Sequence, residues 1–267
     1  MKKETIFGIL VVAGILASAA CVIPLYLSEP NPYPQNQEFY RVIELDPAGT
    51  ILIENSVGYI EVRGWDRNEV EITAQDEWGR MFGRRDWFYG WGGSSGPNVQ
   101  VDKIENFVKI KTLISGKEDT LRPVRYYLNV PRSVNLKDIR NGQGDIRIAD
   151  LYGSVRVELE EGDIKIENFS GSLDISLGKG VVEAELLDMR PDDDIKITVK
   201  EGPITLSLQP EVNARLDATA ANGTITSDFD LGQALPAKKV KALIGKSEAA
   251  AISVTALNGI IRLRKIA

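Results

Sequence analysis

The chain has 267 residues, of which 43% are hydrophobic and 26% are charged, a balance typical of a folded protein with one large β domain or two small ones. Its 32 basic and 38 acidic residues give a net charge of -6, which argues against nucleic-acid binding, because nucleic-acid-binding proteins normally carry a basic face. The chain contains no histidine, so imidazole-based catalysis and nearly all catalytic zinc sites are excluded.

Residues 1–28 are predicted to form an N-terminal membrane anchor. The stretch from Ile6 to Leu27 has no charged residue over 22 positions. A helix of this length reaches about 33 Å, which is enough for a hydrocarbon core of about 30 Å. Lys2 and Lys3 precede the stretch, and lysines favour the cytoplasmic side of a membrane helix. We therefore expect a single-pass cell-membrane protein with an extracytoplasmic body.

Two alternatives for this segment stay open. Ala17-Ser18-Ala19 is acceptable as a signal-peptide cleavage site, and the residues that lead to Cys21 loosely resemble a bacterial lipobox. These alternatives predict a secreted protein or a lipoprotein attached through Cys21, and both also place the body outside the cytoplasm. Cys21 is the only cysteine of the chain, so we expect neither a disulfide framework nor a thiolate metal cluster.

Residues 29–38 are predicted to be a stalk, and residues 39–267 a single all-β domain. The stalk has prolines at positions 30, 32 and 34 and no apolar periodicity, which favours an extended spacer. In the body, short runs alternate apolar and polar residues between Gly, Asn or Asp, as in TILIENSVGYIEVRGW at 50–65. No stretch of the body has the periodicity of a convincing amphipathic helix.

An irregular segment at 76–98 interrupts the strand pattern and is the predicted interaction loop. Tryptophan and arginine are the residues that binding hot spots favour, so the loop could stack on sugar rings, bind a protein or rest at a membrane interface. The alternative is a hairpin loop that folds over an open end of the domain and caps its core. The predicted interaction residues are Trp78, Arg80, Phe82, Arg84, Arg85, Trp87, Phe88, Tyr89 and Trp91.

A period of 18 residues organises the middle of the body. GDIRI at 144–148 returns as GDIKI at 162–166. A unit that cannot bury its apolar face alone, but stacks on copies of itself, predicts a right-handed β-solenoid, a β-helix-like stack of short strands. In rows of 18, the columns are Gly144, Gly162 and Gly180; Ile146, Ile164 and Val182; Leu151, Phe169 and Leu187; and Val155 and Leu173.

An antiparallel β-sandwich or meander is the alternative fold. Asn222-Gly223 and Asn258-Gly259 are good type I′ hairpin turns. Strict parallel stacking would also place Arg147 on Lys165, and like charges directly opposite each other are unfavourable.

Two groups of carboxylates are predicted to be a solvated face and a turn. The first group does not follow the spacing of a calcium loop, and RPDDDIK at 190–196 is typical of a turn. The glycines precede strands and not helices, so they form no phosphate loop. We therefore predict no catalytic, metal-binding or cofactor-binding residue. The groups are Glu158, Glu160, Glu161 and Asp163, and Asp192, Asp193 and Asp194.

Short strand motifs recur at 51–74, 126–136, 141–166 and 244–265, most fully as GDIRIADLYGSVRV at 144–157. With these segments the chain resembles the DUF4097-type family of candidate bacterial and archaeal adhesins of unknown function, whose members carry repeated units of the form nGdI.v..l.G.v.v, over nearly all of 39–267. The resemblance implies a β-solenoid on the cell surface or in the envelope, often tethered to the membrane. It implies no catalytic residues, because the family has none assigned.

The function predicted from these observations is non-enzymatic contact with a surface glycan or an envelope protein. One alternative is an accessory or regulatory ectodomain of an envelope-stress system. Another is a β-helix enzyme that cleaves polysaccharide, which the fold class permits but no constellation of residues demands.

Overall fold

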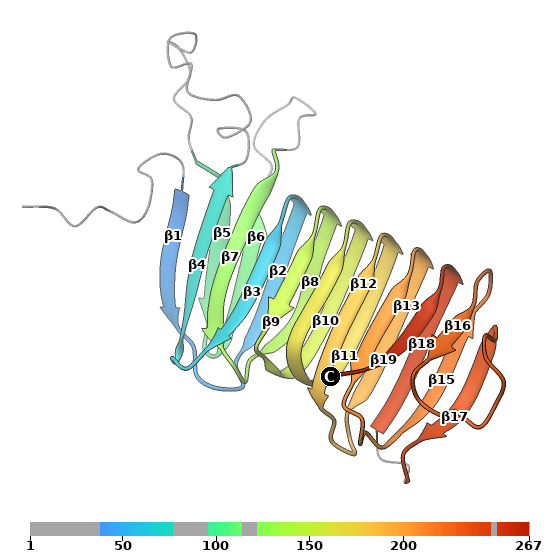
Figure 1. Ribbon diagram of the computed structural model, residues 1–267. Coiled ribbons are helices and arrows are strands. Elements are labelled where there is room, and N and C mark those ends of the chain that lie inside the picture. Colours follow the sequence, from blue (N-terminus) through green and yellow to red (C-terminus); the bar gives the residue numbers. More distant parts are fainter. Residues whose placement is uncertain (1–37, 77–95, 114–121, 247–249, 267) are drawn as a thin grey trace, which may run out of the picture. The chain divides into compact units, whose positions relative to one another are not determined.

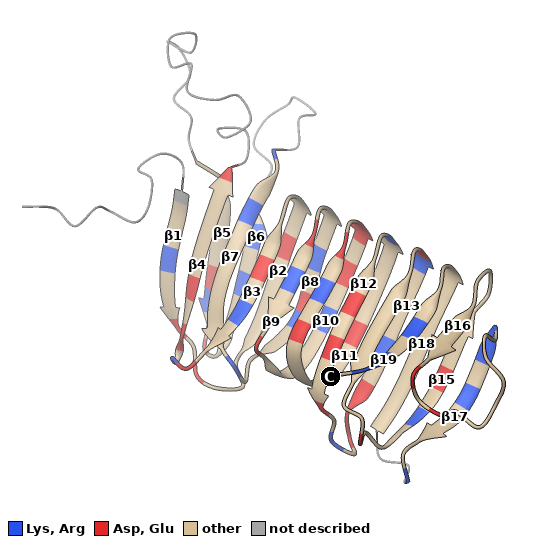
Figure 2. Ribbon diagram, in the orientation of Figure 1, with Lys and Arg blue, Asp and Glu red and all other residues tan. Residues whose placement is uncertain are grey.

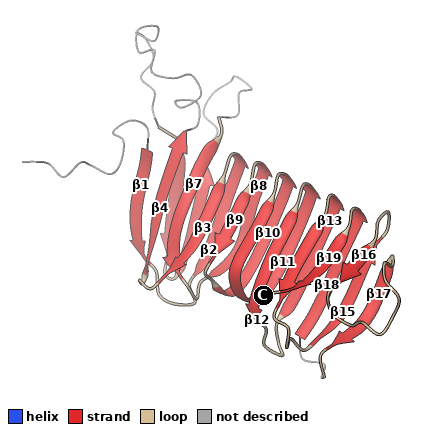
Figure 3. Ribbon diagram, viewed as in Figure 1, coloured by secondary structure: helices blue, strands red, loops and turns tan. Residues whose placement is uncertain are grey.

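The computed structural model describes residues 38–76, 96–113, 122–246 and 250–266, all within one compact unit, Gln35–Ala267. The predicted anchor at 1–28 and the stalk up to residue 37 lie outside the described residues. Among the described residues, no helix has the length and apolar character that a membrane crossing requires. The described part of the chain is all-β, as the sequence predicts (Figure 3).

The strands are short, and most of them alternate buried and solvent-facing residues, as the apolar and polar alternation predicts. They are β1 (Glu38–Glu44), β2 (Thr50–Val57), β3 (Ile60–Trp65), β4 (Glu69–Asp76), β5 (Val99–Ile104), β6 (Phe107–Thr112), β7 (Val124–Pro131), β8 (Asn135–Gln143), β9 (Ile146–Ala149), β10 (Tyr152–Glu161), β11 (Ile164–Lys179), β12 (Val182–Asp188), β13 (Asp194–Glu201), β14 (Ile204–Leu208), β15 (Ala214–Ala220), β16 (Ile225–Ser227), β17 (Lys239–Ile244), β18 (Ala250–Asn258) and β19 (Ile261–Lys265).

The strands stack side by side in two walls, which we call wall A and wall B (Figure 1). Pairing within the stack is parallel, and the antiparallel pairs β1–β4, β4–β7, β5–β6 and β15–β17 lie at its two ends. Wall A runs in the order β5, β6, β2, β8, β10, β11, β13, β18, β15 and β17. Wall B runs in the order β1, β4, β7, β3, β9, β11, β12, β14, β19 and β16.

Each coil of the stack is one strand of wall A followed by one strand of wall B. The 18-residue repeat is the length of one such coil, because Ile164 pairs with Ile146 in wall B and Leu173 pairs with Val155 in wall A. The long strand β11 serves both walls, since it turns the corner at Gly171. The predicted solenoid is therefore confirmed as an architecture, and its right-handed sense stays a prediction.

A column of glycines forms the corner where each coil passes from wall A to wall B. Gly162 has φ +140°, a backbone conformation that residues with a Cβ rarely adopt. A Cβ on Gly162 would also lie 2.3 Å from the carbonyl oxygen of Gly144 in the neighbouring coil. The recurring glycine is thus required by the close approach of the coils. The full column, in spatial order, is Gly58, Gly144, Gly162, Gly180, Gly202, Gly259 and Gly223.

Acidic residues offset the repulsion between like charges on stacked coils, which had favoured the alternative fold. Arg147 and Lys165 are register partners, as predicted, and the Glu167 carboxylate binds both, at 2.7 Å to the Arg147 guanidinium and 2.9 Å to Lys165 Nζ. Asp145 Oδ1 accepts a hydrogen bond of 2.9 Å from the backbone N–H of Asp163 in the next coil. Asp145 and Asp163 are therefore corner residues that tie one coil to the next.

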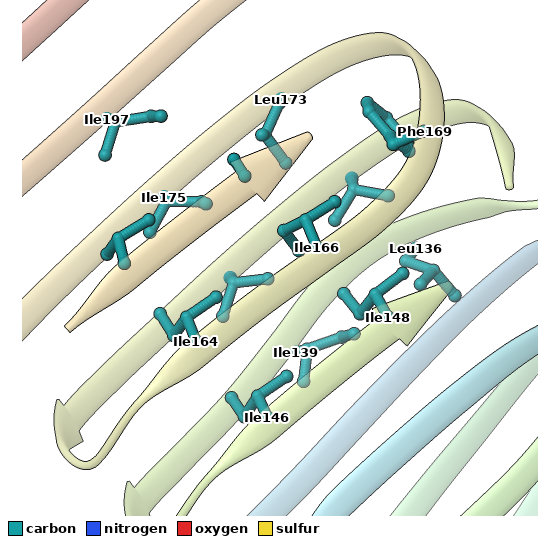
Figure 4. Packing of buried hydrophobic residues seen from close by; sticks show 14 of the residues in the cluster. Leu136, Ile139, Ile146, Ile148, Ile164, Ile166, Phe169, Leu173, Ile175 and Ile197 are labelled. Atoms are coloured by element: carbon teal, nitrogen blue, oxygen red, sulfur yellow. The ribbon is translucent and has the colours of Figure 1, made fainter. Parts of the chain in front are cut away.

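The inner faces of the two walls form one hydrophobic core (Figure 4). Phe169 is fully buried and fills the corner within β11. The predicted column below it is wrong by one residue, because the register shifts and Phe169 pairs with Leu186, not Leu187. Leu186 is consequently buried and Leu187 only half-buried.

The last coil of the chain is not the last coil of the stack. β18 lies between β13 and β15 in wall A, and β19 lies between β14 and β16 in wall B. Asn222-Gly223 and Asn258-Gly259 join strands of different walls, so they do not form the hairpin turns that the alternative fold required. Their local sequence suits a tight turn, but the parallel partners on either side decide where the chain goes.

Candidate functional site

The nine residues of the predicted interaction loop lie outside the described residues. The structure describes the two flanks of their segment, 77–95. β4 ends in wall B at Asp76, and β5 begins in wall A at Val99. The loop stays a prediction, and the candidate site is built from the described residues around its base. The nine residues are Trp78, Arg80, Phe82, Arg84, Arg85, Trp87, Phe88, Tyr89 and Trp91.

An ion pair fixes the base of this segment to the next strand of wall B. The nearly buried carboxylate of Asp76 lies 3.5 Å from the Arg122 guanidinium, and Asp76 pairs with Val124 of β7. Residues 114–121, also outside the described ranges, end just before Arg122. Val124 in turn lies against the Gly58 corner. Segments 77–95 and 114–121 are therefore both attached at the glycine-column edge of the domain.

A hydrogen-bonded cluster of side chains supports this corner from inside. Thr112 Oγ1 donates to Asn55 Oδ1 at 2.8 Å, so its single proton is used and the Tyr126 hydroxyl must donate to Thr112 Oγ1 at 2.6 Å. Asn55 Nδ2 donates to the carbonyl oxygens of Val57 and Val124. Burial raises the pKa of Tyr126 to about 12. The corner is thus held by a specific polar network.

Aromatic side chains gather on the outer face of wall B close to this base. We call Tyr40, Val42, Tyr59, Arg125 and Tyr127 the tyrosine surface. The register places Tyr40 and Tyr127 on either side of Thr73, so they lie on the same face of three adjacent strands. Tyr40 is 48% exposed and Val42 is 43% exposed, which are large values for such side chains.

The rings of the tyrosine surface contact one another and a cation. Tyr59 and Tyr127 pack edge to face, with ring centres 6.0 Å apart and an interplanar angle of 61°. The Arg125 guanidinium lies 5.9 Å from the centre of the Tyr59 ring. The Tyr59 hydroxyl donates to Glu61 Oε2 at 3.1 Å. Burial, followed by the nearby Glu61 carboxylate, raises the pKa of Tyr59 to about 12.

This arrangement suits recognition. Tyrosine buries much area at low cost in side-chain entropy, and both tyrosine and arginine are enriched among residues that dominate binding energy. Neighbouring contacts also fix the ring of Tyr59 in advance, which lowers the cost of ordering it on binding.

The predicted carboxylate groups hold the structure together. Glu158 pairs with Arg156 at 2.9 Å and with Arg140 at 3.3 Å, and Asp193 Oδ2 accepts the Arg190 backbone N–H at 2.6 Å in a turn. The pKa of Glu158 is held below its usual value, first by the hydrogen bond from Arg156. Within the described ranges, no three His, Cys, Asp or Glu side chains are placed to hold a metal ion.

Sequence reasoning missed the tyrosine surface although a signal was present. Tyr40 and Tyr127 occupy the solvent-facing positions of alternating strands, where polar residues are more usual. Tyr40 and Tyr127 are far apart in the sequence, and they become neighbours only because β4 pairs with both β1 and β7. The sequence did not predict these antiparallel pairs, since they lie outside the 18-residue repeat.

Comparison with known proteins shows likeness to one family and to several solved structures. A family model described as Toastrack DUF4097 matches residues 94–264. A proposed cell adhesion protein from Clostridium sporogenes is 13% identical, with a TM-score of 0.46, over 86% of this chain and 100% of that one. A proposed adhesin from Bacteroides fragilis is 12% identical, with a TM-score of 0.34, over 87% and 99%. No curated protein matches the chain.

Proposed function

Because the chain belongs to the Toastrack DUF4097 family, we propose that it is a membrane-anchored extracytoplasmic protein that acts by non-enzymatic contact with a surface glycan or an envelope protein. The observation that carries the proposal is the tyrosine surface at the base of segment 77–95. An exposed patch of rigid aromatic rings with a guanidinium is typical of a contact surface. The proposed contact surface combines this patch with the predicted Trp/Arg loop.

The proposed location rests on the N-terminal sequence. The uncharged run from Ile6 to Leu27, preceded by Lys2 and Lys3, supports an anchor with the body outside the cytoplasm. Lipidation at Cys21 or cleavage after Ala19 are the alternatives, and both leave the β domain in the same compartment. The proposal therefore requires the partner to be extracytoplasmic.

A pull-down on isolated envelope of the source organism and on its purified glycans tests the proposed function. The full-length protein is compared with a variant in which residues 78–92 are a Gly-Ser loop, and with the double variant Tyr40→Ser and Tyr127→Ser. Tyr152→Ser is the matched control, because Tyr152 is 47% exposed and lies outside the tyrosine surface.

We expect the loop replacement and the double variant each to weaken binding by about tenfold or more, since hot-spot residues each contribute more than ~1–2 kcal/mol. The control should bind like the wild type. Wild-type binding in both test variants would refute the proposed contact surface. New reducing sugar ends in the glycan sample would instead support a glycan-cleaving enzyme.

A further inference from the structure

The outer face of wall A carries a second feature, a hollow of about 580 Å³. Pockets of about 300–1,000 Å³ are the size that binds small ligands or a sugar unit. The small side chains of Ser154 and Ser172 lie next to each other on β10 and β11 and leave room above the sheet. The residues that line the hollow are Thr50, Asn135, Lys137, Ser154, Val155, Arg156, Ser172, Leu173, Asp174, Asp194 and Lys196.

A β-bulge places one lysine at the hollow. Ile51 and Leu52 of β2 pair with Leu136 and Asp138 of β8, so Lys137 is an extra residue in this strand. The register of β8 with β10 shifts at the same place. A bulge redirects a side chain out of the regular alternation and is common beside binding sites. Lys137 is consequently exposed at the rim of the hollow, next to an outward-facing Asp138.

Two lysines at the hollow lack an ion-pair partner within the described residues, whereas several other lysines of this wall are paired. Figure 2 shows that basic and acidic residues lie on neighbouring strands. Lys109 and Lys111 both bind Glu54, and Lys241 binds Asp217. In the described part of the chain, Lys137 and Lys196 form no ion pair, although both are exposed. The hollow thus offers two lysines whose charge no carboxylate neutralises at contact distance.

The floor of the hollow is polar and partly fixed in position. The Asn135 amide donates to the carbonyl oxygen of Ala48 and accepts the backbone N–H of Ser154 at 3.1 Å. Ser172 Oγ accepts the backbone N–H of Asp194 at 3.2 Å, so its own O–H is free to donate. A row of hydroxyls with a fixed amide can exchange hydrogen bonds with sugar hydroxyls.

The net charge of the lining is positive on a chain that is negative overall. Its cations are Lys137, Arg156 and Lys196 and its anions are Asp174 and Asp194, which gives 3 - 2 = +1, against -6 for the whole chain. Arg156 is shared between Glu158 at 2.9 Å and Asp174 at 3.9 Å. The unpaired charges of Lys137 and Lys196 are therefore the part of the lining that attracts anions.

We infer that this hollow binds a short stretch of an extracytoplasmic glycan that carries more than one acidic sugar unit. Its hydroxyls would meet the Ser154, Ser172 and Asn135 floor. One acid group of the glycan would lie at Lys137 and another at Lys196, because Arg156 and Asp174 separate the two lysines on the intervening strands. The inference rests on the proposed function, which it deepens by naming a ligand class and a separate site. It needs no contribution from the tyrosine surface.

Titration of the full-length protein with defined oligosaccharides tests the inference. The probes are an oligogalacturonate, its methyl-esterified neutral form, and a glycan phosphate oligomer of similar length. The variants are Lys137→Ala and Lys196→Ala, singly and together. Lys200→Ala is the matched control, because Lys200 is an exposed lysine on the same face of the same strand as Lys196 but outside the hollow. Unfolding midpoints check that all variants fold alike.

We expect binding of at least one acidic oligomer, about fivefold weaker for each single variant and about 25-fold weaker for the double variant if the two lysines act independently. The control should bind like the wild type, and added salt should weaken binding. Comparison of the uronate with the phosphate oligomer identifies which acid the site prefers. Equal binding of the neutral form, or equal binding by the control and the test variants, would overturn the inference.

The outcome separates this inference from the proposed function. Envelope binding that depends on the tyrosine surface, without binding of any acidic oligomer, refutes the hollow alone. Binding of an acidic oligomer that depends on Lys137 and Lys196, with envelope binding indifferent to the loop and to Tyr40 and Tyr127, refutes the tyrosine surface alone.

Discussion

The same register position is asparagine at one end of the stack and leucine in its middle. Asn55 pairs with Asn141, Asn141 with Leu159, and Leu159 with Leu177, all at the inner side of the glycine corner. The middle coils stack on near copies of themselves, so apolar packing is enough there. At the N-terminal end, near the described flanks Asp76 and Arg122, the corner is held by side-chain hydrogen bonds. Repetition thus builds the scaffold, and the region that departs from it carries the tyrosine surface.

The largest expected effect tests how tightly the middle coils approach each other. Gly162→Ala should lower the free energy of unfolding by about 3 kcal/mol or more, because the new methyl group meets the Gly144 carbonyl at 2.3 Å in a backbone region that disfavours a Cβ. Gly232→Ala is the control, since Gly232 has φ +65° but no atom within 4 Å of a Cβ. It should cost only about 1–2 kcal/mol. Urea unfolding of both variants measures the difference, and equal losses would contradict it.

The polar corner at the N-terminal end should respond to alkaline pH. Tyr126 has its pKa raised to about 12 from an ordinary value of 10.0. Its contribution is fully present below pH 10 and is lost as the pH rises towards 12, because the unfolded chain ionises first. Relative to Tyr126→Phe, the wild type should therefore lose ~2–3 kcal/mol over this interval. If the stabilities of the two proteins change in parallel between pH 10 and pH 12, the folded protein does not hold the hydroxyl in its neutral form.

At neutral pH, Tyr126→Phe should be less stable than the wild type, which is the reverse of the order expected at high pH. Tyr126→Phe removes the 2.6 Å hydrogen bond to Thr112 and should cost about 1 kcal/mol. With the alkaline effect, the stabilities of the two proteins should cross near pH 11. Tyr127→Phe serves as a comparison, because Tyr127 faces outward, and it should change stability by less than Tyr126→Phe at neutral pH.

The smallest expected effect concerns the ionic contacts between middle coils. Glu167→Gln should lower stability by about 0.5–1 kcal/mol, because Glu167 bridges Arg147 and Lys165 at a partly exposed site. The hydrogen bond from Lys165 holds the pKa of Glu167 below 4.5, so this contribution is present above pH 4.5 and is lost as the pH falls through the lower folded value. Glu185→Gln, on the next coil, is the control. A loss that does not shrink with added salt or acid would argue against the bridge.

Much of the scaffold could be predicted because each coil repeats the residue pattern of the coil before it. Ile146 and Ile164 stack as the 18-residue period requires, and the glycines lie where the coils come closest. The Leu187 error arose because a register shift moves a side chain to the other face without leaving a mark in the sequence. The tyrosine surface depends on which distant strands pair, and the hollow depends on a bulge at Lys137. Neither is fixed by the repeat.

Because β18 and β19 lie inside the stack, their position affects the order in which the chain can fold during synthesis. Synthesis delivers residues from the N-terminus onward, and folding tends to follow that order. Here the layer between β13–β14 and β15–β16 comes from residues 250–265, which emerge after the strands on both sides of it. A nascent chain that stops at about residue 245 lacks an inner layer rather than its outermost one. Only a chain that extends through β19 can close the stack, so the layers on either side of β18 and β19 wait for residues made after both of them.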